Sequence, residues 1–221
     1  MAKTPAQRAA KHGDKAALPT RPAGVVVNPR APRRPAKAAG NGNLIAIAAS
    51  VASVFLFWYF HLLALVQMTQ LSNGLAMPDS LPGGFSEKYV GQLRTAMNAD
   101  ALGQLQYVHK TAGTLFPLVF GLTVMLLIAL NVPNKRLRRV LWVPPLLFAI
   151  AALWSNFSVD GMLASRTLDG GQVALASVLV IASWVLLAVS LLGALYALYR
   201  GWSKRRSSKG RSDEADAAAS A

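Results

Sequence analysis

Four long apolar stretches, separated by polar gaps, dominate the pattern of hydrophobic and polar positions along this chain. They cover residues 44–68, 113–130, 141–159 and 172–199. A helix rises about 1.5 Å per residue, so each stretch is long enough to cross the roughly 30 Å hydrocarbon core of a bilayer. The pattern therefore predicts an all-α fold, a four-span transmembrane helix bundle that occupies residues 44–200.

The gap at residues 69–108 carries a helical pattern of its own. Ser86 is a helix N-cap residue type, and apolar side chains follow it at helical spacing. We expect a short amphipathic helix that either packs over the end of the bundle or acts as a docking surface or lid. The residues assigned to it are Tyr89, Val90, Leu93, Arg94 and Met97.

Two helix boundaries can also be predicted. Asn98 and Asp100 are cap residues ahead of the second stretch, so its helix should begin there and continue as one rod beyond the bilayer. Pro144 and Pro145 lie near the start of the third stretch, where prolines fit the first turn of a helix.

The basic residues fall in alternate gaps. Most of the 23 Lys and Arg lie before residue 44, between residues 135 and 139, or after residue 199. Cytoplasmic loops of membrane proteins carry an excess of Lys and Arg. The distribution predicts that both termini are cytoplasmic and that residues 69–108 and the amphipathic helix are extracytoplasmic.

A net charge of +14 also fits this topology, because the membrane gathers the basic segments on one face. No zinc-finger, RRM or helix-turn-helix pattern accompanies them, so we expect no nucleic-acid partner. The basic face would instead attract anionic lipids. Residues 1–43 and 201–221 are polar and show no apolar periodicity, which predicts two disordered cytoplasmic tails.

The chain contains no cysteine, which excludes disulfides, thiolate metal sites and cysteine nucleophiles.

His61 and His109 could ligate a haem only if tilt of their helices brought them to one depth in the membrane. With Asp160 they could form a zinc site, but their spacing does not favour one. Catalytic motifs are absent too. We therefore expect no metal or cofactor and, on balance, no enzyme.

Polar residues at membrane depth are the remaining candidates for a site, because ionisable groups are costly there. The topology brings them to the extracytoplasmic side, where they would form a polar vestibule. Each also has a structural interpretation, as an ion pair at the interface or a hydrogen bond between helices. The candidates are His61, His109, Lys110, Asn156 and Asp160.

Residues 89–127 resemble part of a family of uncharacterised bacterial four-helix integral membrane proteins. The family pattern is "G..Y....D..FP..YG", followed in the third span by "EN......ML". Gly113 and Ser155 stand where the family has acidic residues. The matching residues are Gly103, Tyr107, Phe116, Pro117, Phe120, Gly121 and Asn156, with Gly161 to Leu163 resembling the later part. The resemblance implies a bacterial four-helix membrane protein without implying an activity.

Together these patterns lead us to expect a multi-pass protein of the bacterial inner membrane. Its most economical role is that of a non-enzymatic accessory component, which binds a membrane-protein partner or a second copy of itself. The alternative is a membrane enzyme or carrier that handles an amphiphilic small molecule or lipid in an outer-leaflet vestibule.

Overall fold

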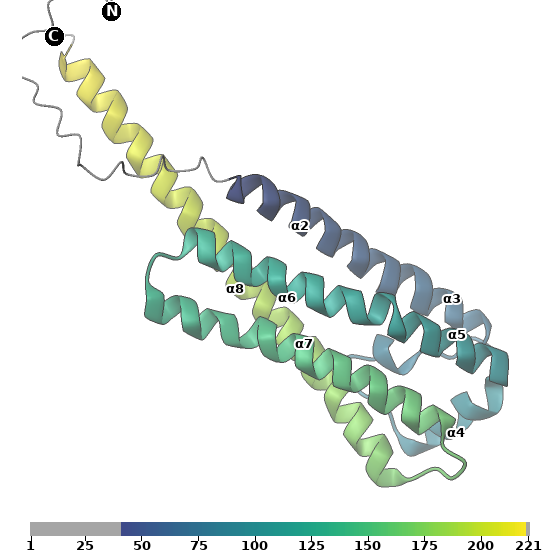
Figure 1. Cartoon of the computed structure of the whole chain (residues 1–221). Helices are drawn as coiled ribbons and strands as arrows, with labels where there is room; N and C mark the ends of the chain where they lie inside the picture. The colour runs from purple at the N-terminus through teal and green to yellow at the C-terminus, as the bar shows by residue number, and fades with distance from the viewer. Residues whose placement is uncertain (1–40, 220–221) are drawn as a thin grey trace, which may run out of the picture. The chain divides into compact units, whose positions relative to one another are not determined.

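The computed structural model describes residues 41–219, and in that part of the chain every regular element is helical (Figure 1). Four of the helices are long and apolar enough to cross a membrane, which confirms the predicted all-α architecture with four spans. This is the architecture of a multi-pass membrane protein. The spans run over Gly42–Gln70, Ala99–Asn131, Lys135–Ala164 and Gly170–Lys204.

The first span changes its helical type along its length. It begins as α2 (Gly42–Phe57), passes through the π-helical segment η2 (Trp58–Ala64), and ends as α3 (Leu65–Gln70). Single π-helical turns inside α-helices occur frequently at functional sites. The segment η2 places Phe60 and His61 within the bundle, whereas Trp58 and Tyr59 remain exposed.

The second span is not the single rod that the sequence predicts. It consists of α5 (Ala99–Lys110) and α6 (Ala112–Asn131), with a break at Thr111, whose backbone angles are φ −103° and ψ −90°. The Thr111 hydroxyl donates to the Tyr107 carbonyl at 2.8 Å. Asn98 caps α5 as predicted, because its Oδ1 accepts a hydrogen bond from the Ala101 N–H at 2.8 Å.

The other two spans begin earlier or end later than predicted. α7 (Lys135–Ala164) is capped by Asn134, so Pro144 and Pro145 lie inside the helix and not in its first turn. α8 extends over Gly170–Ala219. It thus includes most of the segment predicted to be disordered after residue 200, because a helix that is already nucleated can propagate through the lysine, arginine and alanine residues of that segment. The predicted N-terminal tail lies outside the described residues, apart from residues 41–43.

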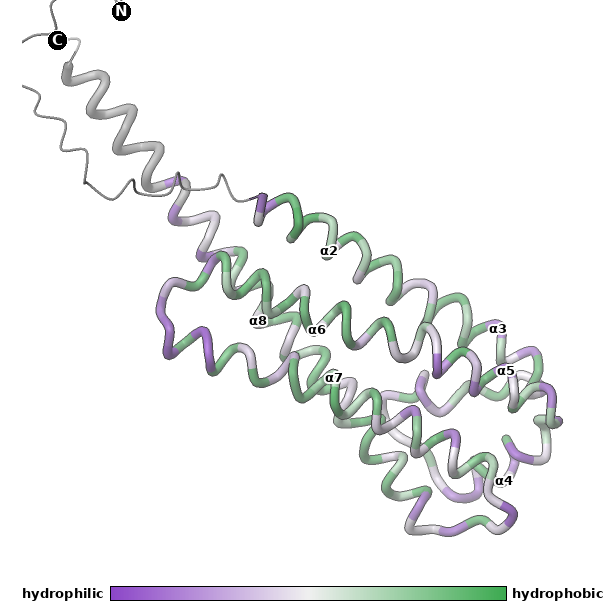
Figure 2. Tube along the Cα trace, viewed as in Figure 1, coloured by the Kyte–Doolittle hydropathy of each residue, from purple (hydrophilic) through white to green (hydrophobic). Residues whose placement is uncertain are grey.

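α6 is the central helix and packs against α2, α7 and α8, while α7 also packs along α8 (Figure 1). Aromatic rings fill much of the contact, including the pairs that Phe116 makes with Phe57, Phe120 and Phe148. The outward faces of the spans are apolar, as Figure 2 shows along the tube. Leu122, for example, is 68% exposed. Such a surface suits contact with lipid.

One end of the bundle is covered by residues 71–98, and we call it the capped end. It contains the short 3-10 helix η3 (Pro78–Ser80) and α4 (Glu87–Ala96), which Ser86 caps through the Tyr89 N–H. Gly84 has φ +78°, and a Cβ there would lie 2.4 Å from Ser177 Oγ on α8. Glycine is therefore required where this loop meets α8.

Candidate functional site

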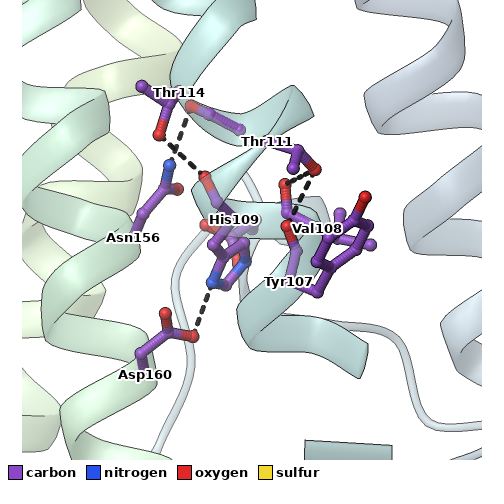
Figure 3. Close-up of polar contacts among 9 residues, drawn as sticks. Tyr107, Val108, His109, Thr111, Thr114, Asn156 and Asp160 are labelled. Carbon is purple, nitrogen blue, oxygen red and sulfur yellow. Dashed lines mark hydrogen bonds and ion pairs between the residues drawn. The ribbon is translucent and has the colours of Figure 1, made fainter. Parts of the chain in front are cut away.

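An aspartate, a histidine and a second aspartate meet at the capped end, and we call them the Asp–His–Asp triad. His109 comes from α5, Asp79 from η3 and Asp160 from α7. His109 Nδ1 lies 2.7 Å from Asp160 Oδ1, and its Nε2 lies 3.2 Å from Asp79 Oδ2. Figure 3 shows the ring of His109 directed toward the Asp160 carboxylate on the neighbouring helix.

The loop that carries Asp79 is fixed from two directions. Trp184 on α8 donates its indole N–H to the Asp79 carbonyl at 3.1 Å, and Tyr89 on α4 donates its hydroxyl to the Ala76 carbonyl at 2.7 Å. Met77, between them, is completely buried. These contacts hold the Asp79 carboxylate against His109.

Because the triad is buried, its charged groups strongly affect one another. His109 is 2% exposed and Asp79 is 7% exposed. Burial alone raises the pKa of the Asp79 carboxyl, but the imidazolium charge of His109 and its polar contact outweigh this, so that the pKa lies below its ordinary value of 3.8. The approach of His109 to Asp79 is that of an ion pair, because its alignment does not meet hydrogen-bond geometry.

Asn156 completes the hydrogen bonding of α6 near the triad. Pro117 has no N–H, so it leaves the Gly113 carbonyl without its usual partner four residues along the helix. The Asn156 Nδ2 amide on α7 donates to that carbonyl at 2.8 Å. Asn156 is itself buried. Its amide therefore links two spans at the point where Pro117 interrupts the backbone hydrogen bonds of α6.

A small cavity of about 40 Å³ lies inside the bundle beside the triad, and we call it the His61 cavity. His61, Asp79, Ser155 and Asn156 are among its lining residues, together with Trp184 and several phenylalanines. The ring of His61 lies between Phe57 at 4.8 Å and Trp184 at 5.1 Å, measured between centroids. Its Nδ1 and the Ser155 hydroxyl are buried and have no hydrogen-bond partner among residues 41–219.

A second pocket, of about 300 Å³, lies on the other side of the triad and is called the Lys110 pocket. Gln106, His109, Lys110, Asn156 and Asp160 help to line it. Lys110 is exposed, whereas the Asp160 side chain is 16% exposed. The triad therefore separates a pocket at the molecular surface from a cavity in the interior.

A third space lies on the outside of the bundle, between the first span and α5, and we call it the Tyr107 groove. Its volume is about 650 Å³. Tyr59 and Leu63 form one side, and Gly103 and Tyr107 form the other. Gln67, Asp100 and Gln104 add polar groups. Its lining is thus partly apolar and partly polar.

The structure places the polar residues that the sequence singled out around these three spaces. His109 and Asp160 are in contact, and Asn156 borders both the His61 cavity and the Lys110 pocket. His61 lies on the interior side and Lys110 on the exterior side. The predicted candidates therefore lie on both sides of the triad, His61 in an interior cavity and Lys110 at the surface.

The residues assigned to the short helix mostly face the bundle. Val90 and Leu93 are completely buried, and Met97 and Tyr89 are partly buried. Arg94 donates hydrogen bonds to the carbonyls of Ser165 and Arg166 in the turn between α7 and α8. In this arrangement one face of α4 packs over the end of the bundle. A partner would therefore meet the other face of α4, which is polar.

Sequence reasoning missed Asp79. It lies in the segment MPDSLPGG, whose prolines and glycines indicate turns, and aspartate is common in turns for local reasons. The apolar residues beside it, Met77 among them, are a hint in the sequence that this turn enters the core. Within residues 41–219, no three His, Asp or Glu side chains are grouped in a way that would hold a metal ion.

The fold and the site define a class: a four-span helical membrane protein with a buried Asp–His–Asp triad at its capped end. Comparison with models of known protein families, with curated proteins and with solved structures finds no match to this chain.

Proposed function

We propose that this chain is a non-enzymatic, partner-binding component of a bacterial inner membrane, with its capped end outside and both termini in the cytoplasm. The distribution of basic residues supports this orientation. Lys135, Arg136, Arg138 and Arg139 start α7 at the end of the bundle opposite the cap, and Arg200 and Lys204 follow at the same end of α8. Arg138 also lies over the Trp142 ring, 5.5 Å from its centroid, as expected of an interfacial anchor.

The Tyr107 groove is the observation that carries the partner-binding proposal. Tyr107 is 69% exposed in the groove, and large exposed aromatic residues are typical of interfaces. The groove combines apolar and polar lining, which suits a partner segment that passes from the membrane into water. At about 650 Å³ it is also the largest of the spaces described above.

The small volume of the His61 cavity supports a non-enzymatic role, because this cavity offers little space for a substrate. Ligand sites are commonly about 300–1,000 Å³ in volume, whereas the His61 cavity measures about 40 Å³. Asp79 and Asn156, which line the cavity, are engaged with His109 and with the Gly113 carbonyl. We further propose that the basic end binds anionic lipid headgroups, each well-placed Lys or Arg contributing about 1 kcal/mol.

Native mass spectrometry of the full-length chain, extracted from its own membrane into nanodiscs, tests the proposal. A Cβ at Gly103, in the groove, or at Gly91, on α4, would meet no atom within 4 Å. Gly103→Phe should therefore fill the groove without disturbing the fold, and Gly91→Phe is the matched control. We expect a stoichiometric companion protein, either another chain or a second copy, with wild type and Gly91→Phe but not with Gly103→Phe.

Other outcomes would decide against the proposal. A companion lost with Gly91→Phe but kept with Gly103→Phe would move the interface to α4. A chain that stays alone in every sample would remove the accessory role.

A second candidate function uses the same groove. Its mixed lining also suits an amphiphile of the outer leaflet, whose polar head would lie near Gln67, Asp100 and Gln104. A lipid-like mass bound to wild type and lost with Gly103→Phe, with no companion protein, would favour an enzyme or carrier for such a molecule.

A further inference from the structure

We infer that Asp160, His109 and Asp79 form a proton relay that connects water at the capped end with His61 inside the bundle. The ligand of this buried site is a proton, with water as its carrier. This inference is independent of the partner-binding proposal, because it concerns the interior of the bundle and not the Tyr107 groove.

The entrance of the relay is the Lys110 pocket. Asp160 lines this pocket and remains partly exposed, so its carboxylate can exchange protons with water there. The polar residues that line the pocket beside it include Lys110, Gln106, Thr114 and Asn156.

His109 provides the transfer step, because each of its ring nitrogens faces a carboxylate. His109 is an imidazolium with a proton on each nitrogen. Its Nε2–H turns into line with Asp79 Oδ2, 3.2 Å away, and the proton passes to that carboxylate, which breaks an N–H bond and forms an O–H bond. The neutral ring then flips, so that its bare nitrogen faces Asp160, and a proton that Asp160 has taken up from water passes to this nitrogen over about 2.7 Å, which breaks an O–H bond and forms an N–H bond. His109 is again an imidazolium and Asp160 again a carboxylate, while Asp79 carries the transferred proton and no electron has moved.

The His61 cavity provides the last step. A cavity needs about 10–15 Å³ for a water and at least two polar partners, and this one measures about 40 Å³. The unpartnered Nδ1 of His61 and the Ser155 hydroxyl are such partners. Water in the cavity would carry the proton from Asp79 to His61 Nδ1.

The relay ends at His61, and no second exit is evident in the described part of the chain. Asp79 is the titratable group that reaches His61 from outside its own span. α6, α7 and α8 present Phe116, Ser155 and Trp184 to the cavity instead. The next polar pair along the bundle, Ser53 and Thr123, is hydrogen-bonded to itself and to the Ala49 carbonyl.

The experiment measures hydrogen exchange between water and the ring N–H of His61 by solid-state NMR on the full-length chain in bilayers. The chain has three histidines, so the labelled imidazole signals can be assigned with one variant each. Asp160→Asn keeps a hydrogen-bond acceptor beside His109 but cannot carry a proton. We expect it to slow the exchange roughly 100-fold, the lower end of acid–base contributions. Asp100→Asn, an exposed carboxyl at the same end, should not change the rate.

A second variant keeps the test independent of the stability of the triad. A Cβ at Gly161, which lines the Lys110 pocket, would have no neighbour within 4 Å. Gly161→Leu should block the entrance and slow the exchange without touching a relay group, whereas Gly91→Leu should not. Exchange at the wild-type rate in both Asp160→Asn and Gly161→Leu would overturn the relay. So would a wild-type ring N–H that does not exchange at all.

Discussion

At the scale of single residues, the triad joins three parts of the chain through one buried imidazole. The positive charge of His109 is neutralised by a carboxylate on each side. Each carboxylate in turn has His109 as its counter-charge. Removing one member of a buried charged group leaves the others unpaired, which costs far more than the net stability that the group contributes. We therefore expect different substitutions in the triad to lower the free energy of unfolding by different amounts.

His109→Ala should lower the free energy of unfolding by about 3–5 kcal/mol, because it leaves two carboxylates facing each other without a cation. The measurement is thermal or denaturant unfolding of the purified chain in detergent. Adding Asp79→Asn to His109→Ala should recover part of the loss, since it removes one of the unpaired charges. If His109→Ala were as stable as wild type, the triad would not stabilise the capped end.

Acid should weaken the fold through Asp79. Its pKa in the folded protein is below the ordinary value of 3.8, so its ionised form stabilises the fold at higher pH. That contribution is complete above the ordinary value and is lost as the pH falls through the lower, folded value. We expect the unfolding temperature of wild type to decline below about pH 3.8 more steeply than that of Asp79→Asn. Parallel declines would contradict the assignment.

Part of this site could be predicted from sequence. The helical spans bring His109 and Asp160 to the same end of the bundle, and the cost of polar groups at depth identifies both. Asp79 could not be found in this way, because its role depends on a turn folding back into the core, and no periodic pattern encodes that path.

At the scale of elements, proline and asparagine act together across two helices. Pro117 leaves the Gly113 carbonyl without its helical partner, and Asn156 supplies the missing donor from α7. Both residues can be read from the sequence, but their pairing depends on the rotation of α6 against α7, which the apolar pattern does not determine.

Asn156→Ala should cost about 0.6–2 kcal/mol, the range for a hydrogen bond between helices in membranes. The cost should shrink when Pro117→Ala is present, because that substitution restores a backbone N–H for the same carbonyl. Unfolding of wild type, both single variants and the double variant gives the coupling energy. Additive effects would show that the two residues act independently.

At the scale of the whole molecule, the apolar pattern was sufficient to predict the four spans. It could not predict the break at Thr111 or the length of α8, since both depend on local hydrogen bonding or on helix propagation more than on burial. The predicted orientation in the membrane rests on the basic residues alone and is testable directly.

Because the chain lacks cysteine, single cysteines can report that orientation without background. Asp100→Cys is exposed at the capped end and Lys135→Cys is exposed at the opposite end. An impermeant maleimide applied to intact spheroplasts should label Asp100→Cys, and it should label Lys135→Cys only after permeabilisation. The reverse pattern would invert the proposed topology.

The π-helical segment of the first span has a consequence for how such a chain can vary. Each hydrogen-bonded ring in η2 encloses one more residue than a ring of an α-helix. The segment thus accommodates the equivalent of a one-residue insertion, while the span on either side keeps its contacts. Deleting one residue within 58–64 would return the span to a regular α-helix and rotate its two halves relative to each other. Related chains can therefore gain or lose the aromatic surroundings of His61 through a change in length, with no substitution of the residues that form them.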